Sequence, residues 1–519
     1  MNIFWNNGER ETIQGLDILA LRQLDQQIEQ DWVANVTTIS IRARYLSLLP
    51  WLFTEFYSWH LLSDSGQATF DLERFKLAAA RMEIIVLAAT RYGKKWGESG
   101  TTYGGIGPEL YHEDITALEQ DGSIDLEPAG RGGAVYGTYV MPCRGFGLLD
   151  FTVGGQAAPV SVTRRGQELH KARRKVLSPT GLTRLVLEGG TLTTDLLEQE
   201  GVHFSLNGLH ANQEEMELLK EALVKPYVDH AEINLRYAHF TDSARWFMSI
   251  LSDTSSGMNS EEILKLNYRK LVSADSKPDK VELGWGEYEL RRRVHFALEL
   301  LLGAMTHTVI DLVEATVEQV LSLWETEWDK PPLLDKLLPL AANPFTLSLQ
   351  EVADKVPLDV FLDKGPNMSA ARDLSSDQKA LYALTVLIAC KEQTESLRTT
   401  GLLPDRHHYL ERAFSIISRG SQSVSDTLRE LLIAVVIEPH LKTSLRKLGQ
   451  GQKCSLRFFP EGNILRPTGK RVVASSSGDR LGNVLGFFAD SGYLHRIESS
   501  RFSLAPDGSS LLNTLGASA

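Results

Sequence analysis

The sequence predicts a mainly α protein (α+β overall) of several helical domains, with a winged-helix module in the N-terminal third and a small α+β piece at the C-terminus. Its 519 residues exceed the roughly 250–300 at which single hydrophobic cores stop growing, so the chain should divide into domains. Apolar residues at helical spacing recur through most of the chain, whereas short runs of β-branched and aromatic residues are confined to 123–166 and 454–476. With 43% hydrophobic and 23% charged residues, the composition is that of a folded globular protein.

Changes in composition along the chain predict three domains. A stretch rich in serine, aspartate and alanine at 364–378 separates two helical regions, and the first group of β-type runs ends before residue 180. We therefore expect an N-terminal helical and winged-helix domain at 1–180 and a helical middle domain at 181–370. A C-terminal helical domain at 371–519 should end in a small basic α+β module.

The N-terminal part of the chain predicts three helices. The segment 16–30 carries its leucines and isoleucines largely on one stripe, which is typical of a helix packed against a neighbour. The segment 39–62 is apolar on nearly every face and predicts a buried helix, which Pro50 either kinks or divides into two. A third helix is expected at 70–93, with Asp71 as its N-cap.

The residues that follow predict a winged-helix module, which is a helix-turn-helix with an appended β-hairpin. After a glycine-rich loop the sequence predicts a helix, three β-type runs and a further helix, at 108–122, 123–128, 134–142, 158–166 and 167–177. Winged-helix modules often place a helix in the DNA major groove, but many serve only as protein contacts.

The rest of the chain is predicted to be mainly helical. The segment 288–328 contains a single glycine, Gly303, and predicts one long helix or two packed helices. Near the C-terminus, strands are expected at 454–462 and 470–476, followed by a helix at 479–492.

Two basic clusters are the candidate nucleic-acid contacts. The net charge of −12 opposes indiscriminate binding to polyanions, so contact with DNA would require local reversals of charge. The first cluster comprises Arg164, Arg165, Lys171, Arg173, Arg174 and Lys175. The second cluster lies near two phenylalanines and includes Lys453, Arg457, Arg466, Lys470 and Arg471. Basic residues interleaved with aromatic residues suit phosphate contacts and base stacking, and the alternatives are a solvated surface or an acidic protein partner.

No catalytic motif stands out, so neither a catalytic residue nor a metal or other cofactor is expected. The glycine-rich loop lacks the lysine and hydroxyl residue of a P-loop. Asp359, Asp363 and Lys364 lack the spacing of a restriction-type nuclease. The strongest enzymatic alternative is a ribonuclease that uses Arg291 and His295, which lie four residues apart on one helix face.

The sequence also predicts a cytoplasmic protein without membrane contact. The N-terminus lacks the pattern of a signal peptide, and no apolar run reaches the ~18 residues that a membrane span needs. The sequence has three cysteines, which are widely separated: Cys143, Cys390 and Cys454. Because no two of them form a CxxC motif, they are expected to be reduced.

A short segment near the N-terminus carries a family resemblance. Thr38, Arg42, Ala43, Arg44, Tyr45, Pro50 and Trp51 stand together in "TTISIRARYLSLLPW". This stretch resembles the N-terminal "RARY…PW" segment of a family of bacterial proteins of unknown activity that are often encoded among restriction and phage-defence genes. The resemblance implies a bacterial protein complex for antiviral defence, in which the chain acts on foreign DNA with a helicase, an ATPase or a nuclease. It transfers no catalytic residue.

Arg42, Arg44 and Trp51 are expected to have structural roles. Because burying an unpaired guanidinium is costly, one arginine should pair with a carboxylate of the preceding helix, and the other should reach the surface or a phosphate. The expected carboxylates are Asp17, Asp25 and Asp31. Together these observations predict a non-enzymatic DNA-binding or scaffold subunit, with an effector nuclease or a winged-helix transcription regulator as alternatives.

Overall fold

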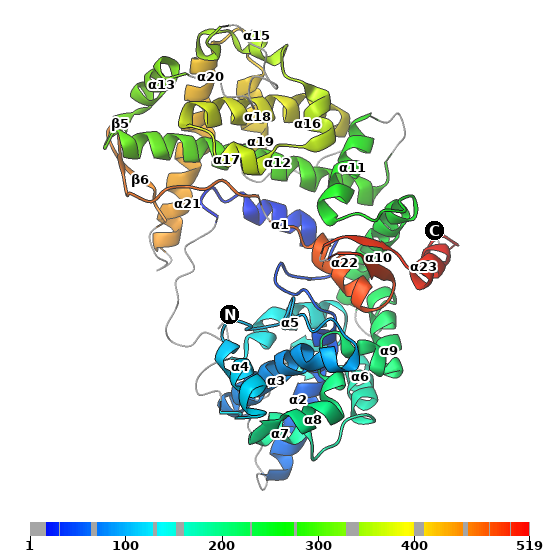
Figure 1. The fold of residues 1–519 in the computed structure, drawn as a ribbon. Coiled ribbons are helices and arrows are strands. Elements are labelled where there is room, and N and C mark those ends of the chain that lie inside the picture. Colours follow the sequence, from blue (N-terminus) through cyan, green and yellow to red (C-terminus); the bar gives the residue numbers. More distant parts are fainter. Residues whose placement is uncertain are drawn as a thin grey trace. The chain divides into compact units, whose positions relative to one another are not determined.

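The structure is a computed structural model that describes residues 17–30, 32–63, 70–127, 132–151, 160–228, 231–273, 278–328, 342–398, 409–449, 455–476, 478–498 and 500–517. These residues are mainly helical and form four small antiparallel sheets (Figure 1). The mainly α prediction is therefore confirmed. Within the described part of the chain, none of the helices has the length and apolar composition that crossing a bilayer requires.

The chain forms two compact units, and each contains segments that are distant in sequence. Of the described residues, those within Gln30–Ser260 and Asp479–Ala519 form unit 1, and those within 17–29 and Glu261–Gly478 form unit 2. This grouping differs from the expected division at residues 180 and 370. The C-terminal segment belongs to unit 1 because its strands and helices pack there, which no change of composition along the sequence reveals.

Unit 1 consists of helices with three two-stranded sheets. Its helices are α2 (Arg44–Ser63), α3 (Leu72–Tyr92), α4 (His112–Asp121), α5 (Ala134–Gly145), α6 (Arg164–Arg174), α7 (Leu182–Glu188), α8 (Thr194–Glu200), α9 (Gln213–Val224), α10 (Ala231–Ser252), α22 (Leu481–Asp490) and α23 (Pro506–Ala517), with 3-10 turns η1 (Gly93–Trp96), η2 (Gly201–His203) and η3 (Gly208–Ala211). Its strands are β1 (Ser123–Asp125), β2 (Leu149–Phe151), β3 (Val160–Val162), β4 (Thr191–Thr193), β8 (Leu494–Arg496) and β9 (Phe502–Leu504), paired β1–β4, β2–β3 and β8–β9.

The first helices of unit 1 follow the sequence pattern closely. The fully buried residues Tyr45 and Trp51 lie on α2, and Pro50 is inside this helix, not between two helices. Helix α3 begins after Asp71, whose carboxylate accepts the Arg74 N–H at 3.0 Å. The predicted N-cap is therefore confirmed, and it satisfies one of the backbone donors that a helix start leaves unpaired.

One predicted strand of the winged-helix module is wrong, because residues 134–142 belong to helix α5. The buried carboxylate of Glu83 accepts the backbone N–H groups of Gly133 at 3.1 Å and Val135 at 2.7 Å, which caps the start of this helix. Val135 and Tyr139 are fully buried, so tertiary packing outweighs the strand preference of β-branched and aromatic residues. Of the other two predicted runs, 158–166 contains β3, which pairs with β2, a strand that the sequence did not predict, and 123–128 contains β1, which pairs with the distant β4.

Unit 2 is built around two long helices, α12 (Lys280–Asp311) and α18 (Ser376–Arg398). The other helices are α1 (Arg22–Gln30), α11 (Ser260–Ser273), α13 (Val317–Thr326), α15 (Leu349–Ala353), α16 (Leu358–Lys364), α17 (Met368–Arg372), α19 (Tyr409–Ile417), α20 (Val424–Leu431) and α21 (Glu438–Gly449), with a 3-10 turn η4 (Pro344–Thr346) and a π-helical segment η5 (Leu432–Ile437). The segment 288–328 therefore forms two helices, which meet at a turn after Asp311.

A three-stranded sheet completes unit 2. Its order is β5–β7–β6, formed by β5 (Ala315–Thr316), β6 (Phe458–Glu461) and β7 (Ile464–Pro467). The hairpin β6–β7 lies partly within the predicted strand 454–462. The predicted strand at 470–476 is wrong, since these residues form no regular secondary structure and pair with no described strand.

Candidate functional site

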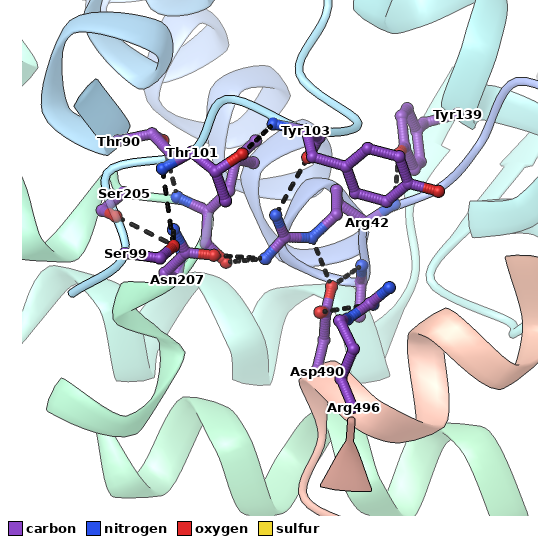
Figure 2. A network of polar contacts seen from close by, with 12 residues as sticks. Arg42, Thr90, Ser99, Thr101, Tyr103, Tyr139, Ser205, Asn207, Asp490 and Arg496 are labelled. Atoms are coloured by element: carbon purple, nitrogen blue, oxygen red, sulfur yellow. Dashed lines mark hydrogen bonds and ion pairs between the residues drawn. The ribbon is translucent and has the colours of Figure 1, made fainter. Parts of the chain in front are cut away.

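The resemblance segment contains a buried arginine that joins three distant parts of unit 1 (Figure 2). The Arg42 Nε atom donates to Asp490 Oδ2 at 2.8 Å, and Nη1 donates to the Tyr103 carbonyl at 3.0 Å. Its Nη2 atom donates to the Leu206 carbonyl at 2.7 Å and to Asn207 Oδ1 at 2.9 Å. Burial acts to lower the pKa of Arg42, but Asp490 more than offsets this effect, so the pKa is raised. Every nitrogen of the side chain is therefore used within the protein.

The second arginine of the segment lies in a fully buried charge cluster. The Arg44 Nη2 atom is 3.2 Å from Glu215 Oε2, and Arg173 Nη1 donates to Glu215 Oε1 at 2.9 Å. Burial opposes ionisation of Glu215, but the two guanidinium groups hold its pKa below the usual value. The Arg173 guanidinium also lies 5.3 Å from the ring centroid of Trp51. This geometry suits a structural role for Arg44 and Trp51.

The expected pairing of these arginines with Asp17, Asp25 or Asp31 is wrong. Arg42 is paired with Asp490 and Arg44 with Glu215, and both arginines are buried, so neither reaches the surface. Asp17 accepts the Arg22 N–H and Asp25 pairs with a histidine of α12, while Asp31 lies outside the described residues. The actual partners are 171 to 448 residues away in sequence, and nothing in the local pattern identifies them.

The first basic cluster lies on α6, and its members fall into two groups. Arg164, Lys171 and Arg174 are exposed on one side of this helix, and Lys175 follows on the same side. They stand at the i, i+7, i+10 and i+11 positions, whereas the opposite side of the helix is buried. Lys175 contacts Glu214 at 2.7 Å in a surface ion pair, and its side chain is 63% exposed. These four side chains form what we call the α6 basic face.

Two residues of this cluster are engaged in contacts within the protein, one buried and one half-buried. Arg173 is fully buried against Glu215, so it is not accessible to a nucleic acid. Arg165 donates to the backbone carbonyls of Phe146 at 3.2 Å and Lys225 at 3.1 Å, and so ties α6 to the loops beside it. The prediction that these two arginines contact nucleic acid therefore conflicts with their positions, because a periodic basic run cannot distinguish buried from exposed charges.

The second basic cluster is only partly available to a ligand. Arg466 lies 3.3 Å from Glu314 and 3.2 Å from Glu461. Arg471 lies 3.8 Å from Asp311. Arg466 and Arg471 are thus accompanied by acidic side chains, as are two members of the α6 basic face, because Arg174 lies 3.9 Å from Glu55 and Lys175 lies 2.7 Å from Glu214.

The remaining members of the second cluster are dispersed. Lys470 is exposed and Arg457 is half-buried. Phe459 is 47% exposed and stands opposite Arg466 in the β6–β7 hairpin. Lys453 lies outside the described residues. The hairpin offers one exposed aromatic ring beside one basic side chain, which is less than a continuous stacking platform.

Arg291 and His295, the ribonuclease candidates, are both buried on α12. Arg291 donates to Glu287 at 2.7 Å. His295 contacts Asp25 through Nδ1 at 2.7 Å and Glu299 through Nε2 at 3.1 Å. Burial acts to lower the pKa of His295, but the two carboxylates raise it to about 10. A 1% exposed imidazolium held between two carboxylates cannot readily reach an RNA substrate or accept its proton.

Other candidate centres offer no assembled chemistry. Asp359, Asp363 and Lys364 lie on the short helix α16, not at strand ends, and Asp363 is 3.5 Å from Arg269. No group of three or more His, Cys, Asp or Glu side chains that could hold a metal ion occurs within the described residues. Cys143 and Cys390 are buried free thiols whose pKa values burial raises. Cys454 lies outside the described residues.

A cavity of about 140 Å³ lies in unit 1 beside α3 and α4. Its lining residues are Leu87, Arg91, Thr102, Pro108, His112, Ile115, Thr116 and Glu119. The charged members, Arg91 and Glu119, pair with each other at 2.8 Å. The volume is below the ~300 Å³ at which small-molecule pockets usually begin. The α6 basic face is therefore the better candidate site.

Comparisons with protein-family models, with curated proteins and with solved structures find no match for this chain.

Proposed function

We propose that the chain is a non-enzymatic DNA-binding or scaffold subunit of a bacterial anti-phage defence complex, and that the α6 basic face contacts DNA. The observation that carries the proposal is that most basic residues of α6 are exposed on one side of the helix. Arg164, Lys171, Arg174 and Lys175 are exposed on one side, while Arg173 on the other side is used inside the protein. A row of exposed basic side chains along a helix matches the spacing of backbone phosphates better than scattered charges do.

The surroundings of α6 support a winged-helix interpretation of this region. The antiparallel pair β2–β3 precedes α6 directly, and Thr163 links them by capping the helix through the Gly166 N–H at 3.2 Å. A hairpin beside a helix is the arrangement that winged-helix modules use at DNA. The defence context rests on the RARY…PW resemblance, and it is the reason for proposing foreign DNA as the ligand and a helicase, ATPase or nuclease as partner.

The nuclease alternative has less support from the geometry. Its candidate residues Arg291 and His295 are buried and paired with carboxylates. A transcription regulator would use the same α6 basic face, and a footprint at a specific promoter sequence would distinguish it from a subunit that binds DNA without sequence preference.

Binding of a labelled 30-base-pair duplex, followed by fluorescence anisotropy across a salt series, tests the proposal. We expect the double variant Lys171→Glu/Arg174→Glu to bind more weakly and to reduce the slope of log K against log salt by about 2, since each lost phosphate contact contributes about 1. The matched control is Lys355→Glu/Lys364→Glu, which reverses two exposed lysines of unit 2 and should leave the slope unchanged.

Three outcomes would contradict the proposal. The first is that the wild-type protein shows no salt-sensitive binding to duplex or single-stranded DNA. The second is that the control variant loses as much affinity as the α6 variant. The third concerns the defence context: if phage plating efficiency on cells that carry the whole gene neighbourhood does not change when Lys171 and Arg174 are reversed, the α6 basic face has no role in defence.

A further inference from the structure

Helix α21 of unit 2, which is labelled in Figure 1, has buried residues on one side and exposed residues on the other. On the buried side, His440 Nδ1 donates to the Ile18 carbonyl at 3.1 Å, and its Nε2 accepts the Arg457 N–H at 3.0 Å. Ser455 donates to Ser444 at 2.9 Å on the same side. Burial lowers the pKa of His440 to about 4, so the ring is neutral and can both donate and accept. These contacts fix α21 and determine which of its sides faces outward.

The exposed side carries a row of leucines. Leu445 is 58% exposed and Leu448 is 41% exposed, while Leu441 is partly buried against the core. The three residues stand at i, i+4 and i+7, the spacing of a seam between two packed helices. Large apolar side chains exposed in a row are more informative than isolated ones, because they suggest a surface that another molecule covers.

Unpaired basic residues accompany the leucine row. Lys442 and Arg446 each follow a leucine of the row by one residue, so both lie along the same side of it. Both are exposed, and neither forms an ion pair with a described residue. From Pro439 to Pro460 the sequence contains no aspartate or glutamate, although the whole chain has a net charge of −12. This surface is therefore a local reversal of charge that no acidic side chain among the described residues neutralises.

The segment before α21 also departs from regular structure. The π-helical turn Leu432–Ile437 leads directly into α21. Such turns are rare and occur frequently at functional sites, because each inserts an extra residue that redirects the side chains beyond it. Here the side chains beyond it are those of the leucine row.

We propose that the leucine face of α21, formed by Leu441, Lys442, Leu445, Arg446 and Leu448, docks an amphipathic helix of a partner protein that carries acidic residues beside its apolar row. The spacing of the leucines favours a helix, since it presents ridges that fit between those of another helix. The two unpaired cations favour an acidic partner. A second copy of the same face is disfavoured because its charges would repel. A membrane surface is disfavoured because the face carries no tryptophan or tyrosine, which interfacial helices commonly place at the headgroup level.

The docking surface does not depend on DNA contact by the α6 basic face, and its test leaves α6 intact. The probes are two labelled 21-residue helical peptides with leucine at every a and d position. One carries glutamate and the other carries lysine at the flanking e and g positions. Binding to the full-length protein is measured by fluorescence anisotropy. The wild-type protein should bind the glutamate peptide at least tenfold more tightly than the lysine peptide.

Two variants locate the contact. Leu445→Glu should weaken binding of the glutamate peptide at least tenfold, because it places a charge in the apolar row. Lys442→Glu/Arg446→Glu should reverse the preference, so that the lysine peptide binds more tightly than the glutamate peptide. The control Lys355→Glu/Lys364→Glu makes the same charge change elsewhere on unit 2 and should behave like the wild type. All substituted side chains are exposed, and circular dichroism with thermal melting verifies that each variant is folded.

Several results would overturn the proposal. Equal affinity for the two peptides, or affinity that none of the leucine-face variants changes, shows that the face does not select an acidic helix. Failure of the wild-type protein to bind the glutamate peptide also overturns it. In that case sedimentation velocity and flotation with vesicles containing 30% phosphatidylserine identify the occupant, since Leu445→Glu would abolish self-association for a second copy or vesicle binding for a lipid surface.

Discussion

At the scale of single residues, the buried arginines of the RARY segment are fixed by their partners. Removing one member of a buried ion pair costs roughly 3–5 kcal/mol, because it leaves an uncompensated charge in a medium of low polarity. Arg42 therefore requires Asp490, and Arg44 requires Glu215. The charged residues of this segment are thus accounted for by the fold of unit 1, without any contact with DNA.

His295 yields a prediction about pH at the same scale. Asp25 and Glu299 raise its pKa to about 10 in the folded protein, against an ordinary value of 6.5. Because the folded state binds this proton more tightly, the stabilisation is fully present below pH 6.5 and is lost as the pH rises toward 10. The variant His295→Gln lacks this proton. We expect its deficit in free energy of unfolding, on the order of a few kcal/mol at pH 6.5, to shrink steadily toward pH 10.

Urea denaturation at four pH values between 6.5 and 10 measures this deficit. A deficit that is constant with pH would show that His295 is not held as a cation. Assaying RNA cleavage by the same variant addresses the ribonuclease alternative, because loss of a wild-type activity would require a catalytic role that the buried position does not favour.

At the scale of secondary-structure elements, helix ends depend on distant as well as local residues. The start of α3 is predictable from sequence, since Asp71 caps it within three residues. The start of α5 is not, because its cap is Glu83, which lies 50 residues earlier in the chain. Burial raises the pKa of Glu83 to about 7, although the backbone donors oppose the shift. Sequence patterns thus identify elements with local signals and misassign those whose stabilising contacts are tertiary.

Replacing Glu83 by glutamine tests the tertiary cap of α5. Glutamine has one acceptor oxygen where the carboxylate has two, so a backbone N–H at the start of α5 should lose its partner, at a cost of about 1–3 kcal/mol. We expect a lower free energy of unfolding and faster amide exchange at the start of α5. The control is Glu73→Gln on the same helix, where the side chain is 78% exposed and the change should be within about 0.5 kcal/mol. Equal effects of the two substitutions would contradict the capping role.

The basic clusters show that sequence patterns predict the candidate site only in part. Composition identified α6 as the place where the chain reverses its charge, and four of its six basic residues are exposed there. Composition could not distinguish Arg173 and Arg165 from these exposed residues, because their contacts within the protein are with residues that are remote in sequence, such as Glu215. It also missed the leucine face of α21, because a leucine row at helical spacing predicts burial unless the neighbouring elements are known.

At the scale of the whole molecule, the chain returns to each unit after leaving it. Met258 and Phe502 exchange backbone hydrogen bonds at 2.8 and 2.9 Å within unit 1, and Asp25 contacts His295 at 2.7 Å within unit 2. The two units therefore form from segments hundreds of residues apart, which a linear scan for composition changes cannot find. Each unit has its own buried residues, so a local defect should remain within the unit that contains it.

A pair of matched core substitutions tests this independence. Phe488 is fully buried in unit 1 and lies 5.1 Å from Phe247, measured between ring centroids. Phe361 is 2% exposed in unit 2 and lies 6.2 Å from Tyr382. Truncating either to alanine should cost about 3–5 kcal/mol through the cavity it leaves. We expect Phe488→Ala to accelerate amide exchange in α10 and α22 but not in α12 or α18, and Phe361→Ala to give the reverse pattern. Faster exchange in both units for either variant would contradict this independence. It would show that the two units unfold as one cooperative unit.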